Sequence, residues 1–162
     1  MSTVTTIEKK AVRVGKYVST EHVDSLIRNY KKERWIQNSE RLGKEDSLGG
    51  WLSADEMEEF IQTAKMYGAD GIRLCFGVYG EGANRPEMNG KQTIAFVATY
   101  SEENNAGDIV QKDLYVDRNG EKGLLAYNWI NPFPPQMTTS KFHGSSLGSM
   151  MVTDKNKGLR VI

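Results

Sequence analysis

The chain has 162 residues, and its 21 basic and 21 acidic side chains give a formal net charge of zero. This balance argues against nucleic acid as the main partner, because phosphate binding usually leaves a basic excess. The absence of an apolar run of about 18 residues argues against a membrane span.

The remaining bulk features predict a single α+β domain over residues 1–162. Cys75 is the only cysteine, so an internal disulfide is impossible and a reducing, cytoplasmic location is expected. Two histidines and one cysteine leave little material for a zinc site, and we expect no cofactor and no metal.

A first helix is predicted after an irregular lead-in, residues 1–18, which lacks the apolar segment of a secretory signal. Ser19 or Thr20 is a good N-cap for this helix, which is expected to end near Gln37. Its apolar stripe is formed by Val23, Leu26, Ile27 and Tyr30. Residues 38–50 are polar and charged, and are predicted to connect this helix to the next.

The second helix has the clearest local signals in the chain. Ser53 and Glu56 have the spacing of a capping box, and Gly68 is suited to end the helix in a left-handed conformation. The apolar face carries Met57, Phe60, Ile61, Ala64 and Tyr67. A helix is therefore predicted between Ser53 and Gly68.

Strands are predicted to follow this helix. Ile72, Leu74, Phe76 and Val78 alternate with Arg73, Cys75, Gly77 and Tyr79, which is the period of a half-buried strand. A second strand is expected over residues 93–100, a third over residues 110–116, and a return strand over residues 123–129 after a hairpin turn at residues 117–120. The expected fold is two helices packed on a mostly antiparallel sheet of four or more strands.

The C-terminal part, residues 131–162, is rich in Pro and Gly and is predicted to be irregular. The segment Asn131–Pro135 is not expected to continue a sheet ladder, because proline lacks the amide donor. Residues 155–162 are expected to form either a short edge strand or a free tail.

The strand segments resemble a known group of proteins. The residues Ala69–Leu74, Phe76–Tyr79 and Gln92–Ile94, with Phe96, Val97 and Thr99, are similar to those of small bacterial proteins found mainly in the Bacteroidota. In that group a helix leads into an A-D-G-I-R-x-x-F-G-x-Y strand, and a Q-T-x-x-F-V-x-T strand follows a variable loop. The resemblance covers about fifty residues and implies family membership, but it implies no reaction, cofactor or catalytic residue.

Two weak catalytic candidates arise from the residues themselves. Cys75 lies beside Arg73, which would favour a thiolate, but a buried free cysteine more often only fills space. Ser146 lies in a G-x-S-x-G pattern, yet no histidine follows it as a hydrolase triad requires. His143 with Ser146 forms a looser pair, for which a solvated loop histidine is the simpler interpretation.

Candidate binding residues are the aromatic and arginine side chains that suit a protein contact. These are Arg73, Tyr79, Arg85, Trp129 and Phe133. They point to the Gly80–Gly90 loop and the Trp129–Pro135 segment as partner surfaces.

The sequence therefore favours a non-catalytic binding or protein-interaction module, with a protein partner or self-association and with neither nucleic acid nor membrane as partner. One alternative is a small enzyme that uses Cys75 or the region of His143 and Ser146. Another is an accessory or structural component of a larger assembly. The sequence does not identify a small-molecule ligand.

Overall fold

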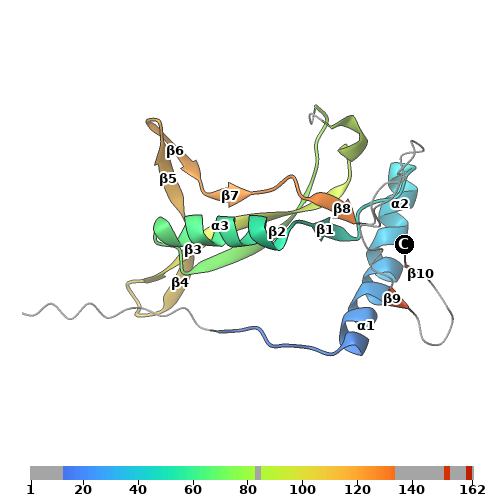
Figure 1. Ribbon diagram of the computed structural model, residues 1–162, viewed down its shortest axis with the longest axis horizontal. Coiled ribbons are helices and arrows are strands. Elements are labelled where there is room, and N and C mark those ends of the chain that lie inside the picture. The colour runs from blue at the N-terminus through green and yellow to red at the C-terminus, as the bar shows by residue number, and fades with distance from the viewer. Residues whose placement is uncertain (1–12, 83–84, 134–151, 154–159, 162) are drawn as a thin grey trace, which may run out of the picture. The chain divides into compact units, whose positions relative to one another are not determined.

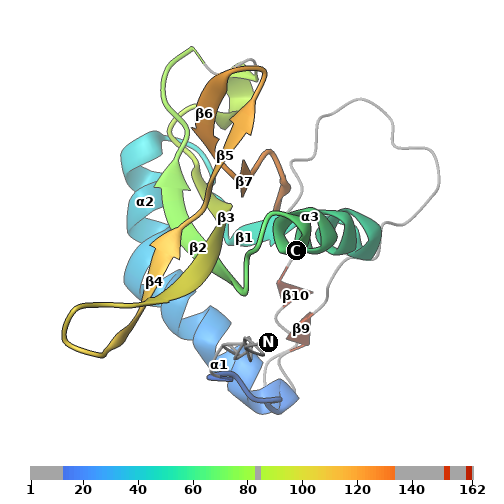
Figure 2. The ribbon, with the colours of Figure 1, turned by 90° about the vertical axis from the view of Figure 1, so that its left-hand side faces the viewer.

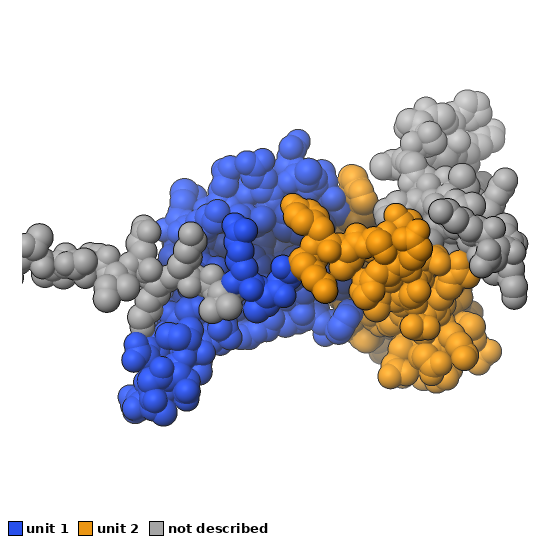
Figure 3. Space-filling model, turned by 90° about the horizontal axis from the view of Figure 1, so that it is seen from below, with its two compact units in different colours: residues 1–15, 52–76, 94–129 blue, residues 16–51, 77–93, 130–162 orange. Residues whose placement is uncertain are grey.

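The computed structural model describes residues 13–82 and 85–133, together with two short strands, Val152–Thr153 and Arg160–Val161. In the described part of the chain it shows two helices and a four-stranded antiparallel sheet, which confirms the predicted α+β class (Figure 1). Contacts divide the chain into two compact units (Figure 3). The first unit contains residues 1–15, 52–76 and 94–129, and the second contains residues 16–51, 77–93 and 130–162. The single domain predicted from the sequence stays a prediction.

The helix of the first unit is α3, Ala54–Met66, and its start confirms the predicted capping box. The Ser53 side chain accepts the backbone N–H of Glu56 at 3.1 Å, and the Glu56 carboxylate accepts the backbone N–H of Ser53 at 2.9 Å. These two bonds satisfy amides that have no partner within the helix. Gly68 follows the helix with a φ of 92°, so the predicted left-handed stop is also confirmed.

The substitution Glu56→Gln is expected to weaken the dependence of stability on pH under acidic conditions. Hydrogen bonds from the backbone and side chain of Ser53, and from Tyr127, hold the pKa of Glu56 below its usual 4.5. A carboxylate whose pKa is lower in the folded than in the unfolded state stabilises the fold above its unfolded pKa. That contribution is lost as the pH falls through the folded pKa.

Urea titrations from neutral pH into the acidic range measure this effect. Glu59→Gln is the control, because Glu59 is exposed on the same helix and its side chain forms no hydrogen bond among the described residues. Equal acid dependence in the wild type and in Glu56→Gln would contradict the assignment.

The sheet has the order β2, β3, β4, with β7 also paired to β3. Its strands are β2 (Gly71–Val78), β3 (Gln92–Glu103), β4 (Ile109–Asp113) and β7 (Ala126–Tyr127). The third strand was predicted as one element over residues 110–116, which is wrong, because the chain changes partners at Leu114. The Leu114 N–H donates to the Ala98 carbonyl, whereas the Leu114 carbonyl accepts the N–H of Leu125.

The hairpin of β5 (Tyr115–Arg118) and β6 (Glu121–Leu124) follows this break. Asn119 and Gly120 form its turn with φ values of 57° and 85°, and the Gly120 N–H donates to Asp117 Oδ1 at 2.9 Å. This confirms the predicted turn, since Asn and Gly tolerate positive φ. The single return strand predicted over residues 123–129 is wrong, because buried Leu125 separates β6 from β7.

The core of the first unit lies between α3 and the sheet. Phe60 is 6% exposed and its ring packs on that of Tyr127, with 5.7 Å between centroids. The other buried apolar residues of this unit are Ala64, Ala69, Phe96, Val97, Ala98, Val116 and Leu125. The ring contact of Phe60 with Tyr127 therefore joins α3 to β7.

The second unit begins with one continuous helical segment composed of α1 (Thr20–Tyr30), a π-helical turn (Lys31–Trp35) and α2 (Ile36–Leu42). Ser19 is its N-cap, as predicted, and accepts the backbone N–H of His22. The predicted end near Gln37 is wrong, and the predicted connection over residues 38–50 is wrong for residues 38–42, which are helical, and for residues 49 and 50, which begin β1. The polar residues after Gln37 suit an exposed helix, and the segment stops only where Gly43 adopts a φ of 67°.

A two-stranded sheet in this unit joins β1 (Gly49–Trp51) to β8 (Asn131–Phe133). The prediction that the proline segment cannot pair is therefore wrong for Asn131–Phe133. Pro132 lies opposite Gly50, and the neighbouring Phe133 carbonyl accepts the N–H of Leu48. Since alternate residues of a strand bond to opposite sides, Pro132 faces the free edge, where its missing amide costs no ladder bond. Between residues 77 and 93 lies a short 3₁₀ helix, Pro86–Met88.

The C-terminal part was predicted to be irregular. Strands β9 (Val152–Thr153) and β10 (Arg160–Val161) pair antiparallel, in agreement with the predicted short edge strand. The other positions in residues 134–162 lie outside the described residues.

Candidate functional site

The two predicted residues of β2, Arg73 and Cys75, do not form a reaction centre. The Arg73 guanidinium forms an ion pair with Asp113 on β4 and donates to the Gln111 carbonyl at 3.1 Å. Arg73 is therefore committed to a cross-strand contact, although 44% of its side chain is exposed. Cys75 is a half-buried free thiol. No hydrogen bond from a base to Cys75 occurs among the described residues.

Tyr79 follows β2 and belongs to the second unit. It is 8% exposed, and its hydroxyl accepts a hydrogen bond from the Thr93 hydroxyl at 3.1 Å. A buried, hydrogen-bonded tyrosine of this kind fills the core and satisfies its own polar atom. The structure therefore places Tyr79 inside the second unit and not on the partner surface expected from the sequence.

The loop that follows Tyr79 is held closely at its C-terminal end. Arg85 donates to Glu87 at 3.1 Å, and Met88 is 1% exposed. Gly90 has a φ of 76°, and a Cβ at this position would lie 2.6 Å from a methyl carbon of Leu42. This end of the loop is thus packed against the end of the long helix.

The other predicted contact residues differ in exposure. Trp129 is 50% exposed with a φ of 69°, whereas Phe133 is half-buried in β8. His143, Ser146 and Pro135 lie outside the described residues. Trp129 remains suited to a contact, and the predicted enzyme site at His143 and Ser146 stays a prediction.

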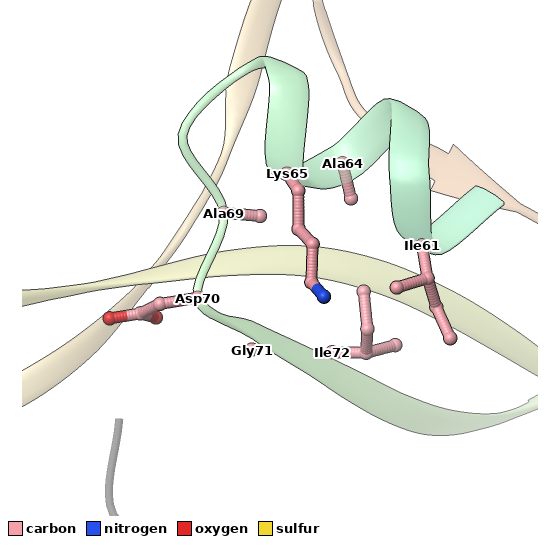
Figure 4. Close-up of a pocket in the computed structure, with 7 residues that line it drawn as sticks. All are labelled: Ile61, Ala64, Lys65, Ala69, Asp70, Gly71 and Ile72. Atoms are coloured by element: carbon pink, nitrogen blue, oxygen red, sulfur yellow. The ribbon is translucent and has the colours of Figure 1, made fainter. Parts of the chain in front are cut away.

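A small cavity of about 250 Å³ lies in the first unit between α3 and the start of β2 (Figure 4). It is lined by Ile61, Ala64, Lys65, Ala69, Asp70, Gly71 and Ile72. Lys65 extends toward the apolar lining, while the Asp70 carboxylate points away from the helix (Figure 4). Asp70 Oδ2 accepts the backbone N–H of Ser101 at 3.1 Å. The cavity brings together no nucleophile with a base, and is smaller than the roughly 300 Å³ at which ligand pockets begin.

A cluster of buried polar groups in the second unit was missed by the sequence analysis. Asp46 is 3% exposed, and its Oδ1 accepts the backbone N–H groups of Ser47 at 2.8 Å and Gln92 at 2.7 Å. Its carbonyl accepts the indole N–H of Trp35 at 2.7 Å, and its N–H donates to Ser39. Asp46 therefore joins the helix to the start of β3. No local sequence signal indicates it, because two of these partners come from other elements.

Lys91 belongs to the same buried cluster and is 2% exposed. Burial is the main cause that lowers the pKa of its ammonium group, and the charge of Lys44 acts in the same direction. The nearby carboxylates, Asp46 first among them, partly offset this effect. A lysine with a lowered pKa suits general-base chemistry, but an almost fully buried one cannot meet a substrate without rearrangement. We therefore assign the cluster to folding.

Exposed apolar side chains are the most prominent unassigned feature. On β2, Leu74 is 60% exposed and Phe76 is 80% exposed, and Val78, the next alternate residue, is 63% exposed. On the long helix, Val23, Leu26 and Ile36 are 39%, 56% and 46% exposed. Such side chains are common singly, whereas rows of them on one element indicate contact surfaces.

Three further findings bear on function. Within residues 13–82 and 85–133, no three His, Cys, Asp or Glu side chains are grouped so that they could hold a metal ion. No helix in the described part of the chain has the length and apolar character that crossing a bilayer requires. Comparisons with protein-family models, curated proteins and solved structures found no match for this chain.

Proposed function

We propose that this chain is a non-catalytic protein-interaction module that binds a partner protein through the helix Thr20–Leu42. The observation that carries the proposal is that none of the three segments of this helix contains a buried residue. Its apolar side chains Val23, Leu26 and Ile36 remain exposed.

Two polar contacts within the second unit help to orient the helix. Tyr30 donates its hydroxyl hydrogen to Gln92 at 2.5 Å, and Trp35 donates its indole N–H to the Asp46 carbonyl at 2.7 Å. Most helices in globular proteins owe their stability to burial of an amphipathic face, and isolated helices are marginal in water. A helix that leaves Val23, Leu26 and Ile36 exposed to solvent is suited to receive the apolar surface of another chain.

The charges of the helix favour a protein partner over nucleic acid. The helix carries charges of both signs, four acidic and five basic: Glu21, Asp24, Arg28, Lys31, Lys32, Glu33, Arg34, Glu40 and Arg41. Arg28 is also paired with Asp24 at 2.6 Å. Phosphate-binding helices instead present a basic stripe. A mixed face of this kind suits the polar rim that surrounds an apolar protein contact.

Location and family form part of the same proposal. The single Cys75 and the balanced charge support a cytoplasmic protein that binds neither nucleic acid nor membranes. The strand motifs of residues 69–79 and 92–99 support membership of the bacterial group that they resemble. A role as an accessory component of a larger assembly is one form that such binding takes.

The proposed function can be tested by placing a photo-crosslinking amino acid at position 26 in cells that make the protein. The expected result is a specific adduct with another protein, absent when the same group is placed at Ser25, an exposed helix residue off the apolar stripe. Absence of any adduct above the level at Ser25 would overturn the proposal.

Leu26→Ser is expected to weaken binding to the captured partner about fivefold, as loss of about 1 kcal/mol at an interface would do. Because Leu26 is 56% exposed, the unfolding free energy should change by less than about 0.5 kcal/mol. Titration calorimetry and urea denaturation measure the two effects, with Ser25→Asn as the matched control. A large loss of stability in Leu26→Ser would show instead that Leu26 supports the fold.

A further inference from the structure

Strand β2, which lies beside β3 in Figure 2, is an edge strand of the four-stranded sheet, because among the described residues it pairs with β3 alone. Its residues Leu74 and Phe76 are 60% and 80% exposed. An exposed edge carries unpaired backbone N–H and C=O groups that can receive a further strand. Open hydrogen-bonding groups and exposed apolar side chains therefore occur together on β2.

The usual obstacles to edge pairing are absent from this strand. Gly71–Val78 contains no proline and no lysine, and Arg73 is its only charged residue. The Arg73 charge is already neutralised by Asp113 within the same chain. Natural edge strands usually carry prolines or outward charges that prevent association. The absence of proline, and of any charge other than the paired Arg73, indicates that pairing at this edge is tolerated or used.

The hydrogen bonds of β3 show which residues of β2 face the free edge. Ala98 bonds through its N–H and its C=O to Leu125 and Leu114, on the side away from β2, so the odd-numbered residues of β3 bond toward β2. A Cβ on Gly71 would lie 2.8 Å from the Thr99 hydroxyl, which places these two residues opposite each other. The odd-numbered residues of β2 therefore bond to β3.

It follows that the even-numbered residues of β2 direct their N–H and C=O groups to the free edge. These are Ile72, Leu74, Phe76 and Val78, which are also the apolar residues of the strand. A strand that adds here would form its hydrogen-bonded pairs with these four residues, and would place its own side chains beside theirs.

We propose that a second copy of this chain pairs antiparallel with β2 about a two-fold axis at Cys75. In this register Leu74 lies opposite Phe76 of the second copy, and Ile72 lies opposite its Val78. Each of these four apolar residues then lies opposite an apolar residue of the second copy. Arg73 lies opposite Gly77 of the second copy, where no side chain opposes it.

The charge pattern and the geometry favour a second copy over another partner. The four even-numbered residues of β2 are uncharged, and so are the same four residues of a second copy. The zero net charge of the chain creates no long-range repulsion between the copies. Shifting the axis to Leu74 would leave Val78 unpaired, and shifting it to Phe76 would leave Ile72 unpaired. A two-fold contact of this kind also consumes the free edge of both copies, so association stops at the dimer.

The native chain provides its own probe of this register. Cys75 is the only cysteine, and the axis would bring the two Cys75 residues into a non-hydrogen-bonded pair with Cα atoms roughly 4.5 Å apart. Disulfide formation requires Cα separations of about 4.4–6.8 Å. Mild oxidation with diamide, which accepts the two hydrogens of the thiols, should therefore link two chains through Cys75.

The test combines sedimentation velocity with this oxidation. We expect a dimer that dissociates on dilution, a diamide-linked dimer, and at least tenfold weaker association in Phe76→Asp. Tyr115→Ser is the matched control, because Tyr115 is 53% exposed on β5 and lies outside the contact. Since Phe76 is largely exposed, Phe76→Asp should fold normally, which circular dichroism verifies.

Three results would overturn the proposal. One is a monomer at all concentrations up to the millimolar range, and another is a dimer that Phe76→Asp leaves intact. The third is a dimer that Phe76→Asp disrupts but that forms no Cys75 disulfide, which excludes this register. The proposal does not depend on the helix Thr20–Leu42, so a monomer that still binds a partner through Leu26 would leave the proposed function standing.

Discussion

Asp46→Ala is expected to lower the unfolding free energy by about 3 kcal/mol, because each of the two buried amides that lose their acceptor costs about 1–3 kcal/mol. Those amides are the N–H groups of Ser47 and Gln92, both within 2.8 Å of Asp46 Oδ1. Asp46 itself is 3% exposed, so water cannot readily replace the carboxylate. The loss should appear as a lower urea midpoint with an unchanged denaturant slope.

Asp46→Asn is the matched control for this prediction. The asparagine amide oxygen can still accept both N–H groups, although without the strength of a charged acceptor. We expect a loss of about 1 kcal/mol, clearly smaller than that of Asp46→Ala. Equal losses in the two variants would show that the negative charge of Asp46, and not its role as an acceptor, stabilises the second unit.

Structural features that depend on only a few neighbouring residues were predicted correctly from the sequence. The Ser53 and Glu56 capping box, the Ser19 N-cap and the Asn119–Gly120 turn all follow from side chains that bond within about three residues or from residues that tolerate positive φ. The α+β class follows from the same signals, because they place the helices and strands in order.

Elements that depend on distant partners were not predicted. The helix continues past Gln37 to Leu42, and only Gly43 stops it, because exposed polar residues neither favour nor end a helix strongly. Pro132 was expected to be unpaired, yet its pairing with β1 depends on residues about eighty positions earlier in the chain. For Pro132 the deciding contact lies far away in the sequence, whereas the stop at Gly43 is a local feature that the polar residues before it did not reveal.

In the candidate site, too, local sequence patterns predicted some features, and contacts between residues far apart in the sequence were not predicted. Alternation along β2 predicts two faces, but it does not say that the apolar one stays exposed at Leu74 and Phe76. The ion pair of Arg73 joins residues 40 positions apart, and the bond from Asp46 to Gln92 joins residues 46 positions apart. The sequence therefore selects residues by their chemistry and does not place them in the fold.

Phe60 and Phe76, both in the first unit, provide the sharpest test of this arrangement. Phe60→Ala is expected to lower the unfolding free energy by about 3–5 kcal/mol, the usual cost of emptying a buried aromatic site. Phe60 is 6% exposed and packs on Tyr127, which in turn donates its hydroxyl hydrogen to Glu56 at 2.9 Å. Losing the ring therefore removes packing and loosens a contact to the helix start.

Phe76→Ala makes the same chemical change on β2, where the ring is 80% exposed. In dilute solution, where the chain is monomeric, it should change the unfolding free energy by less than about 0.5 kcal/mol. If the β2 dimer forms, the wild type becomes more stable than Phe76→Ala as the protein concentration rises, because dimerisation stabilises the folded state by mass action. The deficit of Phe60→Ala should not grow in this way. Thermal unfolding at several concentrations measures both, and a large deficit of Phe76→Ala at high dilution would show that this ring belongs to the monomer's core.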